Sequence, residues 1–305
     1  MKAKQIVTMV AVIAVMGYLY AQPVKGLIKP KEERTAPGKA GQDEHEGHDH
    51  DHDHETAVVD VTTVSQPAKA AIGGEASEKI TAMEAELVKA SAPAQKQKLQ
   101  LELAKAWDAA HQQAPAAFYY KALAQSNNSF ENWVNAGNRF NDAYKFTQDT
   151  AVQPAMVKNA IEAFKAAKAI KPADLEAQTG LGIAYVNQTS LGITDAEGGS
   201  PMQGITLLLD VVAKEPDNWK ANLNLGQFAM KSGQYQKAVD RFSKMVAMPE
   251  SAQRSKVEPY FYLAESYKQL GRKKEAIEAY LKCKELMGDP TMGQTIDNYI
   301  NELKN

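Results

Sequence analysis

The sequence has little of what marks several protein classes. Its 305 residues contain one cysteine, which excludes a framework of disulfide bonds. Lys and Arg number 35 and Asp and Glu 37, so the chain lacks the basic excess that favours nucleic acid as a partner. It also lacks a glycine-rich phosphate loop, a G-x-S-x-G turn and an H-E-x-x-H zinc motif. We therefore expect a protein that is not an enzyme.

The charge that is present is unevenly distributed. Residues 1–42 carry a net charge of +5, residues 43–55 carry −7, and residues 56–305 hold 28 charged groups of each sign. This distribution predicts an N-terminal segment, an acidic tract and a neutral body.

An apolar run follows the first few residues. Residues 6–21 contain no charged side chain. A membrane-spanning helix needs about 20 apolar residues and a secretory signal about 7 to 15, so residues 1–21 are either an anchor or a cleavable signal. Leu19 is unfavourable for cleavage after Ala21, which favours the anchor. We expect a membrane-anchored protein with its body in the periplasm, the alternative being a body that faces the cytoplasm.

Residues 22–74 are predicted to form a disordered linker, because they contain several prolines and no aromatic residue and cannot offset their ordering entropy by burial. Within the linker, residues 43–55 alternate histidines with acidic residues. Imidazoles at this density can bind Zn, Ni or Cu. The predicted metal ligands are His45, His48, His50, His52 and His54. The alternative is a solvated spacer that gains charge below about pH 6.5.

From about residue 75 onward, apolar residues recur three and four positions apart, which predicts helices throughout. One register occurs four times: a small residue in a first helix, a small residue in a second helix, and a bulky residue four positions later. The first set is Gly137, Gly182, Gly226 and Ala264; the second is Ala160, Gly204, Ala238 and Ala276; the third is Phe164, Leu208, Phe242 and Tyr280. The small residues allow close helix approach, while the bulky residues fill the space between units.

This register resembles the tetratricopeptide repeat, about 34 residues that form two antiparallel helices, here of the kind found in membrane-anchored bacterial proteins. The resemblance implies an all-α helical-repeat solenoid over residues 97–290, with a leading helix in residues 75–96 and a capping helix in residues 291–305. The five implied units are 97–129, 130–174, 175–218, 219–256 and 257–290. The second and third units contain insertions that lengthen their helices, form two adjacent lids or are tolerated surface loops, and the last is favoured because connecting segments accept insertions at little cost.

The resemblance also implies a binding surface. In this family the first helices line a concave groove that takes a peptide, and amides suit such a ligand because they both donate and accept hydrogen bonds. The corresponding groove residues here are Asn138, Asn141, Asn187, Lys220, Gln227, Lys231, Glu265 and Lys268. Lys220 with Asn224 reproduces only part of the family's clamp for two carboxylates.

Two further residues carry no catalytic signal. Cys283 falls at a small position of the last unit, where core packing is expected. His111 lies near a helix end without a partner at a suitable spacing, as a surface or capping residue does.

Three functions stay open from the sequence. The first is a membrane-tethered scaffold or adaptor that needs no cofactor, binds an unknown protein or peptide and contacts the membrane through residues 6–21. The second is binding or buffering of a divalent transition metal by the histidine tract. The third is an accessory subunit of an envelope or cytochrome c assembly machine.

Overall fold

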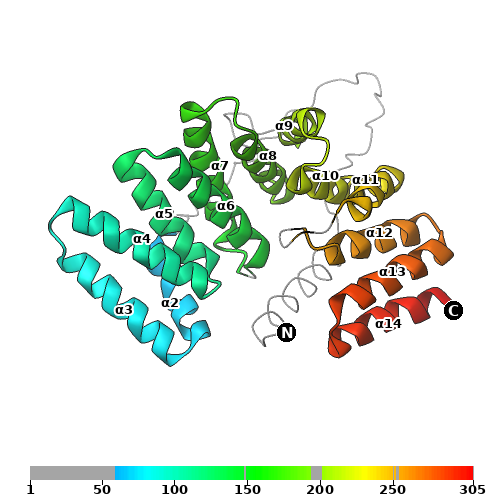
Figure 1. Ribbon diagram of the computed structural model, residues 1–305, viewed down its shortest axis with the longest axis horizontal. Coiled ribbons are helices and arrows are strands. Elements are labelled where there is room, and N and C mark those ends of the chain that lie inside the picture. Colours follow the sequence, from blue (N-terminus) through cyan, green and yellow to red (C-terminus); the bar gives the residue numbers. More distant parts are fainter. Residues whose placement is uncertain (1–58, 148, 194–200, 250, 252–253, 305) are drawn as a thin grey trace, which may run out of the picture.

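The computed structural model describes residues 59–147, 149–193, 201–249, 251 and 254–304, and these residues form thirteen α-helices and no strand (Figure 1). Two leading helices are α2 (Val61–Ile72) and α3 (Gly74–Lys89). Five pairs follow: α4 (Pro93–Ala109) and α5 (Gln113–Asn127), α6 (Phe130–Phe146) and α7 (Gln153–Ile170), α8 (Leu175–Ser190) and α9 (Pro201–Lys214), α10 (Trp219–Lys231) and α11 (Tyr235–Ala247), and α12 (Val257–Gln269) and α13 (Lys273–Met287). The last helix is α14 (Pro290–Lys304).

The helices stack in chain order along a curved array (Figure 1). Each described helix packs against the next one, and the first helices α6, α8, α10 and α12 also contact one another in sequence. Neighbouring pairs thereby cover the apolar faces that a single pair would leave exposed. The predicted all-helical repeat solenoid is confirmed.

Small and bulky residues hold the pairs together as the register predicts. A Cβ atom on Gly137 would lie 2.6 Å from Cε2 of Phe164, and one on Gly226 would lie 2.6 Å from Cζ of Phe242. Both phenylalanines are fully buried. Each ring therefore occupies the space that a side chain on the facing helix would need, which explains the glycines.

The insertion in the second pair extends its helices. α6 and α7 contain 17 and 18 residues, whereas α10 and α11 contain 13 each. Of the three alternatives for this insertion, longer helices are the one observed, and the favoured surface loop is wrong for most of it. In the third pair, residues 194–200 lie outside the described residues.

The prediction of a disordered linker over residues 22–74 is wrong for its last part. Helix α2 begins after Asp60, whose carboxylate accepts a hydrogen bond from the Thr63 backbone nitrogen at 2.9 Å. Val64 and Ala68 are buried, and α2 packs against α5. A segment without aromatic residues cannot build its own core, but α2 completes its burial on a surface supplied by α5.

The predicted localisation is corrected. None of the helices that the structure describes combines the length and apolar character needed to cross a bilayer. The expected anchor depended on residues 6–21, which lie outside the described residues, and the described helices offer no other span.

Candidate functional site on the inner surface

Three of the first helices begin after a residue whose side chain caps the helix. Ser129 precedes α6, Asp174 precedes α8 and Asn218 precedes α10, and each side chain accepts a hydrogen bond from the backbone nitrogen three residues later. These caps satisfy backbone N–H groups at the start of each of the three helices. We call the side on which α6, α8, α10 and α12 face one another the inner surface.

An ion pair spans this inner surface. Lys145 Nζ on α6 lies 3.0 Å from Glu258 Oε1 on α12, although the residues are 113 positions apart. Gln227 Nε2 on α10 donates to the same oxygen at 3.1 Å. Three first helices thus meet at one carboxylate, and the array is curved enough for the second and fifth pairs to touch.

A second set of contacts joins α6, α8 and α10. Asn138 Nδ2 donates to Glu176 Oε1 at 3.1 Å, and Asn138 Oδ1 accepts from Lys220 Nζ at 3.4 Å. Asn141 Nδ2 donates to the Gly180 carbonyl oxygen at 3.0 Å, while Asn141 Oδ1 accepts from Asn187 Nδ2 at 3.5 Å.

The remaining predicted groove residues divide into two groups. Lys231 Nζ donates to Ser190 Oγ at 3.4 Å, which places it with Gln227 on the inner surface. Glu265 is instead buried, with an exposed fraction of 2%, and accepts a hydrogen bond from the Tyr280 hydroxyl. Lys268 Nζ lies 3.6 Å from Glu302 Oε2 of α14. Six of the eight predicted residues therefore lie together on the inner surface. Glu265 and Lys268 instead contact the last two helices, α13 and α14.

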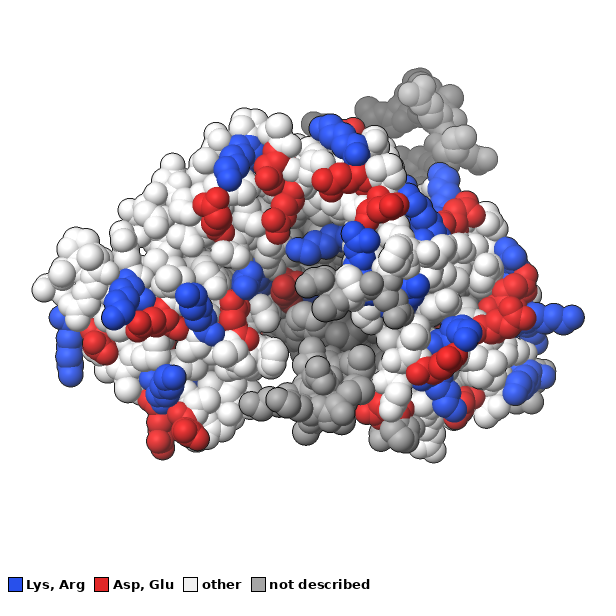
Figure 2. Space-filling model, viewed as in Figure 1, with Lys and Arg blue, Asp and Glu red and all other residues white. Residues whose placement is uncertain are grey.

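Several titratable groups on the inner surface have pKa values shifted from their usual range. Asp142 is in contact with solvent, yet the surrounding protein raises the pKa of its carboxyl, against the opposing effect of nearby lysines. The ammonium group of Lys231 also has its pKa lowered by desolvation. Burial, together with the charge of Glu258, raises the pKa of Tyr262 well above its usual value. Figure 2 shows that Lys and Arg side chains lie next to Asp and Glu side chains over much of the face in view.

Four of these residues were missed by the sequence analysis. Asp142 and Lys145 lie four and seven positions after Asn138, on the same face of α6, and helical spacing alone identifies them. Glu258 and Tyr262 belong to α12, and no local signal shows that this helix approaches α6.

The lone cysteine and the body's histidine take structural positions. Cys283 is buried, its thiol donates to the Val257 carbonyl oxygen, and burial raises the pKa of the thiol to about 12. It therefore stays protonated and is a poor nucleophile. His111 is exposed in the turn between α4 and α5.

The predicted metal site is not tested by this structure. His45, His48, His50, His52 and His54 lie outside the described residues. Within the described part of the chain, no group of three or more His, Cys, Asp or Glu side chains is placed to hold a metal ion. Metal binding by the tract stays a prediction.

Comparison with known proteins identifies the repeat. Models of the tetratricopeptide repeat match residues 189–255 and 257–287. Among solved structures, the APC/C hetero-tetramer Cut9–Hcn1 is similar over 80% of this chain and 41% of that chain, with 15% sequence identity and a TM-score of 0.52. At this identity the likeness supports the fold alone.

Two further solved structures are similar over smaller shares of this chain. A thermophilic TPR protein of Thermus thermophilus has 20% identity over 68% of this chain and 98% of that chain, with a TM-score of 0.49. YrrB, a TPR protein with an unusual peptide-binding site, has 14% identity over 66% and 91%, with a TM-score of 0.40. No curated protein sequence matches this chain.

Proposed function

We propose that this chain, in which residues 189–255 and 257–287 are tetratricopeptide repeats, is a scaffold that binds an extended segment of a partner protein along its inner surface. It acts by binding rather than by catalysis. One observation carries the proposal: polar side chains from α6, α8, α10 and α12, which belong to four different pairs, converge on this surface.

The inner surface has groups that can exchange their present partners for a ligand. The contacts of Lys220 with Asn138 and of Lys231 with Ser190 are both 3.4 Å long and solvent-exposed. Hydrogen bonds of this kind contribute little net stability, so replacing them costs little. Asn187 and Gln227 can both donate to and accept from a peptide backbone.

The charges favour an acidic group in the bound segment. Lys231 is exposed, and among the described residues its ammonium group contacts the neutral Ser190 hydroxyl and no carboxylate, so its charge lacks compensation. An incoming carboxylate would restore that compensation. Lys220 on the same helix is exposed and available to the same ligand.

The test compares charge reversal on two surfaces. The double variant Lys220→Glu, Lys231→Glu alters the inner surface, and Lys165→Glu alters an exposed position of α7 as a control. Partners recovered with the unaltered chain from its native cells are quantified by mass spectrometry for each variant. A partner lost by at least about tenfold with the double variant, but retained by the control, supports the proposal. Equal recovery by all three proteins would refute it.

The partner's identity in this experiment also decides a finer proposal. An accessory role in an envelope or cytochrome c assembly machine requires a component of such a machine among the proteins lost with the double variant.

A further inference from the structure

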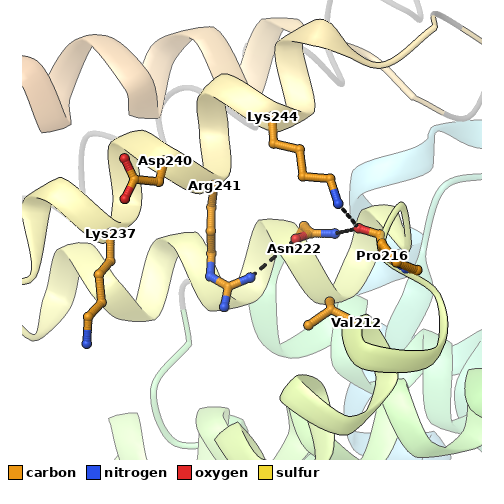
Figure 3. A pocket seen from close by; sticks show the side chains of 7 residues that line it. All are labelled: Val212, Pro216, Asn222, Lys237, Asp240, Arg241 and Lys244. Carbon is orange, nitrogen blue, oxygen red and sulfur yellow. Dashed lines mark hydrogen bonds between the residues drawn. The ribbon is translucent and has the colours of Figure 1, made fainter.

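A separate pocket lies between the α9–α10 connection and α11. It has a volume of about 330 Å³ and is lined mainly by α11 side chains, with Asn222 and Pro216 opposite (Figure 3). We propose that this pocket binds a phosphate group. The site is distinct from the inner surface and does not depend on the proposed function.

Three cations line one face of α11. Lys237, Arg241 and Lys244 follow the spacing i, i+4, i+7, which brings them onto one side of the helix. The neighbouring side of the helix is buried, with Ala238 and Phe242 fully enclosed. Like charges at these spacings destabilise a helix, and among the residues that line the pocket only Asp240 is negatively charged.

A buried amide orients the central cation. Asn222 has an exposed fraction of 2%, and its Nδ2 donates to the carbonyl oxygens of Pro216 and Asn218, both at 2.9 Å. Its Oδ1 accepts from Arg241 Nη1 at 3.3 Å. The amide is thus fixed by the backbone and holds the guanidinium against the pocket wall (Figure 3).

The contacts of the other charged groups show which cations are available to bind a phosphate. Lys244 donates to the Pro216 carbonyl oxygen and lies 3.2 Å from Asp217 Oδ1, so its charge is already paired. Asp240 accepts from Gln236, and its carboxylate points away from the guanidinium of Arg241 (Figure 3). Lys237 contacts only the neutral Gln234 among the described residues.

Arg241, like Lys237, contacts a neutral amide and no carboxylate within the described residues. No carboxylate in the described part of the chain forms an ion pair with it, and desolvation lowers its pKa. A guanidinium presents five N–H donors in a planar fork that matches two oxygens of a phosphate. Lys237, four residues earlier on α11, also lines the pocket and adds a second positive charge to it.

The size of the pocket restricts the ligand. A volume of about 330 Å³ is at the lower end of the range for small-molecule sites, which suits one phosphate group with a short substituent. Such a group is carried either by a small metabolite or by a phosphorylated side chain of another protein. Both sources present the same dianion to Arg241 and Lys237.

The test titrates the full chain with inorganic phosphate near pH 8, where phosphate is a dianion, at constant ionic strength, and follows backbone amide chemical shifts. We expect saturable shifts in α11 and in the α9–α10 connection. Arg241→Gln should weaken binding by about tenfold or more, and Lys237→Gln by about threefold. Lys165→Gln, outside the pocket, should bind as the unaltered chain does.

Circular dichroism checks that each variant is folded. Lys237→Gln leaves the Asn222 contacts intact and keeps the test valid if Arg241→Gln fails to fold. Shifts that do not saturate, or equal affinity in both pocket variants and the control, would overturn the proposal. Phosphoserine that binds as well as inorganic phosphate supports a phosphorylated protein as the source, whereas binding of inorganic phosphate alone supports a small free ligand.

Discussion

The ion pair between Lys145 and Glu258 gives the sharpest prediction about the architecture, since it requires the second and fifth helix pairs to meet. We consider Lys145→Met, Glu258→Gln and the double variant. The exposed fractions of the two side chains are 30% and 17%, so the pair is partly shielded from water. The effect of breaking it should therefore be intermediate. Exposed pairs contribute about 0.2 to 1 kcal/mol, whereas disrupting a buried pair costs about 3 to 5 kcal/mol.

From this position we expect Glu258→Gln to lower the free energy of unfolding by about 1 to 2 kcal/mol, because it leaves Lys145 without its partner. The coupling energy between the two sites should be about 1 kcal/mol. Urea unfolding of the four proteins measures it, and high salt should reduce it. Additivity within about 0.5 kcal/mol would refute the reasoning, because sites that do not touch show no coupling.

Three further predictions address packing, titration and metal binding. Gly226→Ala should lower the free energy of unfolding by about 1 to 3 kcal/mol, because its Cβ would lie 2.6 Å from Phe242; Gly74→Ala, which meets nothing within 4 Å, should change it by less than about 0.5 kcal/mol in the same urea titration. The carboxyl of Asp142 has a pKa above its usual 3.8, so it holds its proton to a higher pH in the native state than in the unfolded state. The native state therefore loses stability as pH rises from 3.8 through the native pKa. Asp142→Asn should therefore raise the melting temperature near pH 7 and leave it unchanged near pH 3; a lower melting temperature near pH 7 would contradict the sign. Calorimetric titration with Ni²⁺ near pH 7.5 should detect binding that disappears when residues 43–55 are deleted, and unchanged binding by the deleted chain would rule out the tract as the ligand.

The repeat architecture could be predicted because its determinants are local. Gly226 and Phe242 are sixteen positions apart, as are Ala264 and Tyr280 in the next unit, and the four-position step from Ala238 to Phe242 recurs in the other units. Helix α2 was missed because its stability comes from contact with α5, about fifty residues later. A short helix that is stabilised by packing on a distant part of the chain shows only a weak apolar pattern of its own.

The candidate site could be predicted in part for the same reason. Asn138, Asn141 and Asn187 lie on faces that helical spacing identifies. Whether α6 reaches α12 depends on small rotations that accumulate over several units, and no single unit encodes them. Glu265 was misplaced because its burial depends on Tyr280 of the following helix, which supplies its hydrogen bond.

The most direct test of the central claim, that the inner surface binds a partner protein, is site-specific photo-cross-linking. A photoreactive phenylalanine is placed at Gln227 on the inner surface and, in a separate protein, at exposed Lys165 on α7. The account predicts that one specific protein is cross-linked from position 227 in the native cells and not from position 165. Cross-linking of that protein from position 165 alone, or equally from both positions, would contradict it.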